Sequence, residues 1–419
     1  MKKILYLTSH DLNAADYGAV LRVRHIAQML AQHGDVGIVL GSRHRDVLKN
    51  ARKSQAGFEL LHRIYFAPTQ YPFLRRQRHK IDRRFIDMEG YQAAPEDCVK
   101  LNALMGEHDL TWIHGLETAN RFDIWRWPAT VLDVDDIPSS LYRLRVSHSK
   151  NLYDKYWNML QMLLWRRNER QLSERFDAVC VCSKLDEGLL GGGEKIYVLP
   201  NGFDPPKQIP ARHPVDPPQI GFVGTFIYWA NCDGVRWFID QVWPRILEKI
   251  PRARLRLAGE RGENLFRGQN IDALGWVRDM EHEMANWSLS IVPVLAGGGT
   301  RIKILEAFSR KCPVVSTSLG AYGHDVQHGC QLLISDSVAG FAESCLRLLE
   351  NPMEGKRLAK NAWDTFMRNG RWDRHTKCIS HIVEKIAGRR HDYDGCESPL
   401  ESKVPSKSTI EPKLGVQWP

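Results

Sequence analysis

Short apolar runs and longer stretches with helical spacing take turns along the chain. The run KILYLTS (3–9) stops at polar residues, a helical pattern follows from about Val20 to Gln32, and DVGIVL (35–40) is the next run. Strand, helix and strand in this order are the unit of a parallel sheet. The pattern therefore predicts an α/β protein with parallel strands.

The same rhythm continues along most of the chain and is interrupted once. Before the interruption it predicts strands at 61–67, 110–115, 130–135, 177–183 and 195–200, and helices over 96–108 and 152–174. After the interruption it predicts strands at 219–224, 253–259, 289–294, 313–317 and 331–335, and helices near 233–249, after the glycines at 297–299, and at 337–350, 355–367 and 372–387. The interruption, 203–218, carries six prolines, which neither continue a helix nor donate within a sheet, and is therefore a linker.

This organisation predicts two Rossmann-like parallel α/β domains that face a central cleft, which suits a chain of 419 residues. We expect an N-terminal domain at 1–202, a C-terminal domain at 219–371, and a helix at 372–387 that packs back towards the N-terminal domain. The segment 388–419 lacks periodicity and is predicted to be disordered. Because open α/β sheets bind ligands at the carboxyl ends of their strands, the cleft is the candidate site.

Composition and charge narrow the class of protein. The nine cysteines lack paired metal-type spacing, and DAVCVCS (177–183) is more typical of a buried strand than of a metal site. No secretory segment or apolar run of spanning length is visible, so we expect a cytoplasmic protein. The net charge of +9 fits solubility, an anionic ligand or an anionic membrane face.

A basic and aromatic segment stands out within the N-terminal half. YPFLRRQRHKIDRRF (71–85) interleaves aromatic side chains with cations, most of them at 74–84. Peripheral contact with the inner face of a membrane and a solvated helix face are equally good interpretations. We do not expect nucleic acid as a partner, since no recognition motif accompanies the patch.

The stretch LSIVPVLAGGGTRIKILEAF reads as strand, glycine turn and helix. Thr300 is a plausible N-cap, and the turn at Gly297, Gly298 and Gly299 exposes backbone N–H groups beside the positive end of the helix dipole. Arg301 and Lys303 add full positive charge. An ordinary tight turn would explain one glycine but not three with two cations, so we favour the binding of an anion.

Glu306 lies further along the same predicted helix, between Leu305 and Ala307. A carboxylate at this place could bridge the two hydroxyls of a ribose. A solvated or capping glutamate is the plainer interpretation, but the apolar neighbours place this helix against the core. The whole stretch is compatible with a sugar attached to a nucleotide diphosphate.

Several stretches resemble retaining glycosyltransferases of family 4, which have the GT-B fold. They are GGGTRIKILEAFSRKCPVVSTSLGAYG, VCSKLDEGLL…KIYVLPNGFD (181–204), IGFVGTFIYWANCDGVRWF (220–238) and LGWVRDM (274–280), and the resemblance covers roughly residues 3 to 387. VLDVDDIPSSLYR (131–143) further resembles a branch linked to exopolysaccharide assembly, including PEP-CTERM-associated sugar transferases.

The resemblance implies a donor site in the C-terminal half. In the family two glutamates eight positions apart flank the donor; Glu306 matches the second, which holds the ribose, and Gly298 stands where the first should be. Gly224 and Thr225 belong to a loop that often carries cations in the family and here has none. The resemblance therefore implies a variant in which Arg301 and Lys303 neutralise the diphosphate. The implied donor contacts are Gly224, Thr225, Val277, Gly297, Gly298, Gly299, Thr300 and Glu306.

The resemblance also implies roles for residues of the N-terminal half. His114, at a strand end, matches a histidine that contacts the donor sugar near the reacting carbon, although a lone histidine is more often structural. Gly18 matches the flexible acceptor-side loop. Asp135 and Asp136 follow Asp133 at another strand end and could include an acceptor-side base, a metal site or capping residues; capping is the best interpretation for at least one.

We therefore expect a glycosyltransferase that moves a sugar from a nucleotide diphosphate sugar to a saccharide or lipid-linked glycan. The family implies retention, no required metal and no cofactor. An epimerase or inverting transferase of the same fold is one alternative. A non-catalytic nucleotide-sugar-binding module is another, with Gly298 as the sign of lost activity.

Overall fold

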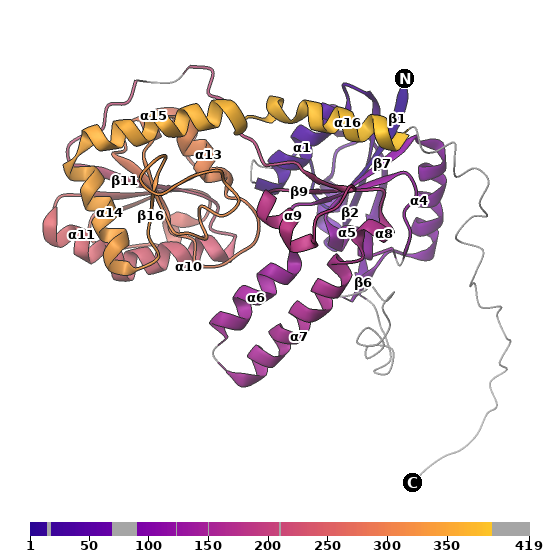
Figure 1. Cartoon of the computed structure of the whole chain (residues 1–419), viewed down its shortest axis with the longest axis horizontal. Coiled ribbons are helices and arrows are strands. Elements are labelled where there is room, and N and C mark those ends of the chain that lie inside the picture. The colour runs from indigo at the N-terminus through magenta and orange to yellow at the C-terminus, as the bar shows by residue number, and fades with distance from the viewer. Residues whose placement is uncertain (15–17, 69–89, 123, 150, 209–210, 388–419) are drawn as a thin grey trace, which may run out of the picture.

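Two sheets, one in each half of the chain, build the molecule (Figure 1). This computed structural model describes residues 1–14, 18–68, 90–122, 124–149, 151–208 and 211–387. The basic segment 74–84 and the tail 388–419, for which we predicted membrane contact and disorder, lie outside the described residues.

The N-terminal sheet has eight strands, all parallel except one at its edge. In spatial order they are β10 (Ile196–Val198), β9 (Ala178–Val181), β8 (Thr130–Val134), β7 (Leu110–His114), β1 (Lys2–Thr8), β2 (Gly34–Ser42), β4 (Phe58–Tyr65) and the antiparallel β3 (Ser54–Gln55). A two-stranded ribbon of β5 (Ala67–Pro68) and β6 (Tyr91–Gln92) lies apart from this sheet. The helices of this half are α1 (Gly18–Leu30), α2 (Arg45–Asn50), α4 (Pro95–Glu107), α5 (Leu116–Asn120), α6 (Pro138–His148), α7 (Leu152–Glu169), α8 (Leu172–Arg175) and α9 (Lys184–Leu190).

The C-terminal sheet has six parallel strands. In spatial order they are β13 (Ile271–Gly275), β12 (Arg254–Ala258), β11 (Gln219–Val223), β14 (Leu289–Val292), β15 (Val314–Ser316) and β16 (Leu333–Ile334). The helices are α10 (Trp229–Trp237), which runs through a π-helical turn (Phe238–Val242) into α11 (Trp243–Lys249), then α12 (Met280–Ala285), α13 (Ile302–Ser309), α14 (Val338–Glu350), α15 (Pro352–Asn369) and α16 (Thr376–Ala387). Short 3₁₀ turns lie at Gly262–Asn264 and Trp372–His375.

Apolar cores cover both faces of each sheet, which explains the continuous apolar runs of the strands. The strand β13 was not among our predictions, because it lies at a sheet edge and is only partly buried, so its sequence shows no apolar run. The helix α6 was also missed, since its partly exposed residues carry little helical periodicity. The predicted helix 152–174 is two helices, α7 and α8, separated at Arg170 and Gln171.

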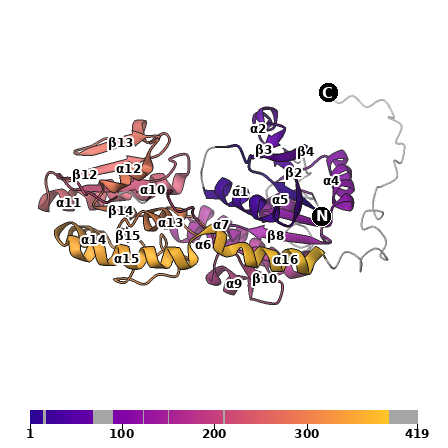
Figure 2. The same cartoon turned by 90° about the horizontal axis from the view of Figure 1, so that it is seen from above.

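The chain passes between the two halves twice, and the two passages lie side by side. The backbone N–H of Phe203 donates to the carbonyl oxygen of Gly370 at 2.8 Å, and a Cβ on Gly202 would come within 2.6 Å of the backbone nitrogen of Trp372. After the second passage, α16 lies on the N-terminal half (Figures 1 and 2). Its buried side chains belong to the core that β1 and α1 form.

Candidate active site

The carboxyl ends of the two sheets meet at the junction between the halves. Two hydrogen bonds cross it: the Asn201 amide donates to Thr300 Oγ1 at 2.9 Å, and the Tyr322 hydroxyl donates to Asp186 Oδ1 at 3.0 Å. Asn201, Thr300 and Tyr322 lie in loops that follow strands, and Asp186 lies in the first turn of α9, which follows β9. Parallel sheets bind ligands at this end of their strands. The sequence-predicted residues of both halves gather around this junction.

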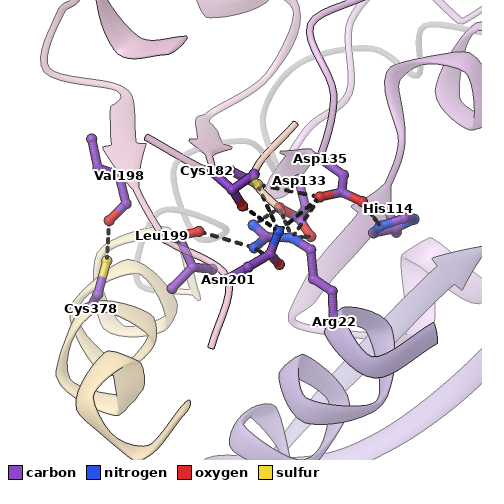
Figure 3. Close-up of polar contacts among 10 residues, drawn as sticks. Arg22, His114, Asp133, Asp135, Cys182, Val198, Leu199, Asn201 and Cys378 are labelled. Atoms are coloured by element: carbon purple, nitrogen blue, oxygen red, sulfur yellow. Dashed lines mark hydrogen bonds and ion pairs between the residues drawn. The ribbon is translucent and has the colours of Figure 1, made fainter. Parts of the chain in front are cut away.

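A buried arginine organises the N-terminal wall of the junction. Arg22 projects from α1 and binds the Asp133 carboxylate with Nε at 3.0 Å and Nη2 at 2.5 Å, and neither side chain has exposed surface. Its Nη1 donates to the Leu199 carbonyl and to Asn201 Oδ1, both at 3.0 Å (Figure 3). Burial opposes the charge of Arg22, but Asp133 outweighs it and raises the pKa of the guanidinium. This pair fixes the loops that follow β8 and β10.

Asp135 is tied into the same network. Its Oδ1 lies 3.9 Å from Arg22 Nε and accepts from the Cys182 thiol at 3.3 Å and from the Asn201 amide at 3.5 Å. Burial acts against its charge, but Arg22 and these donors outweigh burial and lower the pKa of Asp135. The expectation that one of the three aspartates caps a helix is wrong: Asp133 pairs with Arg22, and α6 begins after Ile137 without a side-chain cap.

His114 ends β7 at the junction, and its side chain is almost fully buried. Its Nε2 lies 3.9 Å from Asp135 Oδ2, and neither ring nitrogen has a hydrogen-bond partner among the described residues. Burial lowers the pKa of His114 to about 4, although Asp135 opposes the shift. At neutral pH the ring is therefore an uncharged donor and acceptor, stacked edge-on against His10 at 5.2 Å between centroids.

The glycine turn and Asp136 meet across the junction. A Cβ on Gly299 would come within 2.1 Å of Asp136 Oδ1, and one on Gly298 within 3.0 Å of its Cγ. Gly299 also has φ +70°, a conformation that favours glycine. Two of the three glycines are thus explained by the carboxyl that lies against them. Asp136 keeps exposed surface, yet the protein around it and the nearby Asp135 raise its pKa to about 7.

Arg301 points back over the glycine turn from the helix start. Its Nη1 donates to the carbonyl oxygen of Gly298, whereas Nε and Nη2 have no hydrogen-bond partner among the described residues. The expected N-cap is wrong: α13 begins at Ile302, Arg301 stands at the N-cap position without a side-chain bond, and the Thr300 hydroxyl accepts from Asn201 instead. Unpaired buried donors are costly, so this guanidinium is suited to an anion.

Lys303 reaches from α13 to the loop after β11. Its Nζ donates to Asn231 Oδ1 at 2.8 Å and lies 4.0 Å from the centre of the Phe222 ring. A Cβ on Gly224 would come within 2.9 Å of the same Nζ. The cation that this loop lacks in sequence is therefore supplied by α13. Burial and the neighbouring Arg301 lower the pKa of Lys303 to about 7.

Glu306 lies one turn further along α13. Its Oε1 is 3.4 Å from Arg310 Nη1, and only 14% of its side chain is exposed. Burial raises its pKa, against the effects of Arg310 and Lys303. The carboxylate therefore has one cationic partner within the fold and little water around it.

Of the remaining predicted residues, Gly18 lies at the junction, whereas the recorded contacts of Thr225 and Val277 are within the C-terminal half. A Cβ on Gly18, the first residue of α1, would be 3.5 Å from Ile302 Cδ1, so α1 and α13 approach each other. Thr225 Oγ1 accepts from the backbone N–H of Ile227. Val277 packs against the core of the C-terminal half after β13. A pocket at the ends of β11 and β12 is lined by Phe226, Ile227, Arg261 and Leu265.

Some residues of the site were not predicted. Arg22 was hidden in an apolar helical pattern, where a cation amid buried positions is the signal that could have revealed it. We predicted no role for Asn201, which lies within LPNG, or for Tyr322, which lies within GAYG. In the described part of the chain no three His, Cys, Asp or Glu side chains form a group that could hold a metal ion. No helix described here is long and apolar enough to cross a bilayer.

Comparison with known proteins finds a matching family domain and a relative. Residues 217–351 match the family model described as Glycosyl transferases group 1. An uncharacterised 44.6 kDa protein in the cps region of Klebsiella pneumoniae is 24% identical over 247 residues, which are 54% of this chain and 61% of that relative.

Solved structures resemble the whole fold. Sucrose-phosphate synthase from Thermosynechococcus elongatus superposes with a TM-score of 0.64 at 15% identity, covering 93% of this chain and 100% of the other. Anabaena HepE in complex with UDP-glucose gives 0.59 at 16% identity, covering 92% and 100%. WaaG, a glycosyltransferase involved in lipopolysaccharide biosynthesis, gives 0.58 at 13% identity, covering 90% and 99%. The chain thus has the GT-B fold, and its C-terminal half carries a domain that matches the group 1 glycosyltransferases.

Proposed function

We propose that the protein is a glycosyltransferase that moves a sugar from a nucleotide diphosphate sugar to an acceptor, with retention of configuration. The observation that carries the proposal is the α13 start. There two guanidinium nitrogens of Arg301 have no partner among the described residues, and Arg301 and Lys303 follow the glycine turn. A diphosphate brings charges that match this set of donors. The matching group 1 domain, and HepE with its UDP-glucose, support this class of donor.

In this proposal each wall of the junction has a part. Arg301 and Lys303 stabilise the leaving diphosphate as the bond to the anomeric carbon breaks and the phosphate oxygen keeps the electron pair. The acceptor hydroxyl forms the new bond on the same face and gives its proton to the departing phosphate oxygen. Glu306 binds the ribose, and the neutral ring of His114 binds a sugar hydroxyl near the reacting carbon.

Asp136 could supply the carboxylate that the family has at the position of Gly298. Its carboxyl comes from the opposite domain to the place that a side chain at residue 298 would occupy. We propose that Asp136 binds the donor sugar across the junction, where it accepts hydrogen bonds from sugar hydroxyls. A non-catalytic binding module would need no such carboxyl.

The acceptor is proposed to be a saccharide or a lipid-linked glycan of surface or exopolysaccharide synthesis. The relative in a cps region and the involvement of WaaG in lipopolysaccharide biosynthesis support this class. We propose a cytoplasmic location, where the enzyme works without metal or other cofactor. Activity is therefore expected to survive EDTA, and a loss restored by Mg²⁺ would reject the cationic account of α13.

The decisive experiment joins binding and product analysis. Thermal shift against a panel of nucleotide sugars identifies the donor, because a ligand at a hundred times its Kd stabilises by about 2.7 kcal/mol. NMR of the product formed with saccharide acceptors then gives the anomeric configuration. Retention supports the proposal, inversion or an epimerised nucleotide sugar replaces it by the related GT-B alternatives, and binding without turnover on any acceptor supports a binding module.

A further inference from the structure

The helices α6 and α7 form an antiparallel hairpin that projects from the N-terminal half beside the domain junction (Figures 1 and 2). Among the described residues, the base of the hairpin is the part that is anchored in the fold. There Leu164 and Trp165 of α7 are buried, and the Glu169 carboxylate accepts from the backbone N–H of Ser139 at 2.7 Å. Towards the tip, the two helices have mostly each other for support.

The outer face of α7 carries an apolar stripe that nothing in the described structure covers. Leu152, Tyr156, Met159 and Leu163 are exposed by 84%, 67%, 42% and 54%. Their spacing of four, three and four residues places them on one side of the helix. Tyr153 and Trp157, also exposed, widen the stripe at the tip. Six large apolar side chains within twelve residues are more than the scattered exposure of an ordinary surface.

Positive charge accompanies this stripe. Residues 138–170 contain seven lysine and arginine residues but only two carboxylates. One carboxylate, Glu169, is buried and bonded to Ser139; the other, Asp154, accepts from the Asn151 amide at the start of α7. Lys155 and Arg166 are exposed on α7 itself, and Arg170 is exposed at its C-cap. The hairpin therefore presents apolar and aromatic groups within a cationic surround.

We propose that the α6–α7 hairpin docks on an anionic lipid bilayer, with the stripe of α7 in the headgroup–acyl boundary. Tyrosine and tryptophan suit that boundary, and long cations keep their charges among the lipid headgroups while their stems follow the apolar surface. The stripe spans roughly 18 Å at 1.5 Å per residue, too short to cross a bilayer, so the helix lies on it. A second copy of the chain is the poorer occupant, because two such hairpins would bring like charges together.

The docking does not depend on the proposed transferase activity, but it would place the junction next to the membrane. The segment that leads into α6 begins immediately after Asp136, and Glu169 ties the start of α6 to the end of α7. A hairpin lying on lipid would therefore hold the Asp136 side of the junction close to the bilayer surface, where the sugar-accepting end of a lipid-linked acceptor is found.

The test is cosedimentation of the full chain with sucrose-loaded vesicles of phosphatidylcholine alone or with about 30% phosphatidylglycerol, a content at which basic amphipathic helices bind. The hairpin variant is Leu152→Ser, Tyr156→Ser, Leu163→Ser. The matched control is Val99→Ser, Leu185→Ser, Met353→Ser, three apolar side chains of similar exposure elsewhere. We expect wild type and control to bind the anionic vesicles, and the hairpin variant to bind at least tenfold more weakly.

A charge variant and two solution measurements complete the test. Lys155→Glu with Arg166→Glu is expected to reduce binding to anionic vesicles, as is added salt, which screens exposed charges. Circular dichroism and the thermal shift by a nucleotide sugar show whether each variant keeps its fold and its donor site. Because donor binding is measured without vesicles, a failure of docking and a failure of the proposed function give different results.

Two outcomes overturn the proposal. If the wild type stays in the supernatant with anionic vesicles, the hairpin does not bind membranes. If light scattering then finds a dimer of the wild type but a monomer of the hairpin variant, a second copy of the chain covers the stripe. A hairpin variant that binds vesicles as tightly as wild type assigns membrane binding to another part of the chain, such as the basic segment 71–85.

Discussion

The two walls of the junction treat their charges in opposite ways. On the N-terminal wall, Arg22 is bound by Asp133, Asn201 and a backbone carbonyl, and no exposed surface remains on the ion pair. On the C-terminal wall, Arg301 keeps two donors without a partner in the described residues, and Lys303 has one neutral acceptor. The guanidinium of the first wall is fully bonded within the fold, whereas that of the second has two donors that remain available to a ligand.

The number of unused donors distinguishes the structural role of Arg22 from the ligand-binding role proposed for Arg301, which the sequence around each residue does not. A buried cation whose donors are all used stabilises the loops that bear the site, so its loss is expected to lower the free energy of unfolding. The loss of a cation with unused donors is expected to lower the affinity for a ligand instead. Four experiments, taken from the largest expected effect to the smallest, can break or sharpen this contrast.

Arg22→Met should have the largest effect, and on stability. It leaves the Asp133 carboxylate buried without its partner, which costs about 3–5 kcal/mol of unfolding free energy. Urea unfolding measures the loss. The double variant Arg22→Met, Asp133→Leu removes both charges and should recover a large part of it. A single variant within about 0.5 kcal/mol of wild type, the range of surface substitutions, would show that the pair does not stabilise the wall.

Arg301→Ala should leave the fold intact and weaken the binding of a nucleoside diphosphate. A charged hydrogen bond contributes about 2–3 kcal/mol, which corresponds to roughly thirty- to a hundredfold in Kd. Calorimetric titrations with a nucleoside diphosphate and with the bare nucleoside measure the two affinities, and the affinity for the nucleoside should hardly change. Arg301→Lys should recover only part, because the planar fork of the guanidinium is lost. Equal losses for both ligands would mean that Arg301 merely holds the site together.

Glu306→Ala should weaken both ligands, because the ribose is common to them. Two hydrogen bonds to ribose hydroxyls at about 1 kcal/mol each predict a loss of roughly thirtyfold at most. Titrations with UDP, GDP and their nucleosides measure it, and the unfolding midpoint shows that the fold persists. The matched variant Glu306→Gln keeps the size of the side chain and should retain more affinity. Unchanged UDP and GDP affinities would remove the ribose role.

Lys303 should make diphosphate binding weaker as the pH rises. In the free protein its pKa is about 7, so it is mostly protonated near pH 6 and mostly neutral near pH 8.5. A bound diphosphate favours the charged form and raises that pKa, so protons are taken up on binding above about pH 7. Asp136, with its pKa also at about 7, adds an anion over the same range and acts in the same direction.

The measurement is the Kd of the diphosphate at about pH 6 and about pH 8.5, and we expect a few-fold loss. Calorimetry in buffers of different ionisation enthalpy counts the protons. Lys303→Met should bind more weakly at the lower pH and lose its own share of the pH dependence, which leaves that of Asp136. A wild-type affinity that rises with pH would refute the assignment.

The fold could be predicted from the sequence further than the site could. Continuous apolar runs predicted the parallel strands, because strands covered on both faces have no polar side, whereas the half-exposed edge strand β13 gave no such signal. Local pattern also predicted the glycine turn and the cations of α13. Local pattern could not predict that Asp133 pairs with Arg22, or that Asp136 lies against the glycine turn. Each of these pairs joins residues more than a hundred positions apart in the chain.

The placement of α16 has a consequence for synthesis on the ribosome. The last helix of the described residues, Thr376–Ala387, supplies Ile379, Ile382, Val383 and Ile386 to the core to which β1 and α1 also contribute. The half of the protein that emerges first therefore has an unfinished apolar face until α16 has emerged. The half that emerges second can complete its own core earlier, so the order of folding is reversed with respect to the order of emergence. Until α16 packs on it, this exposed apolar face of the N-terminal half is expected to bind chaperones.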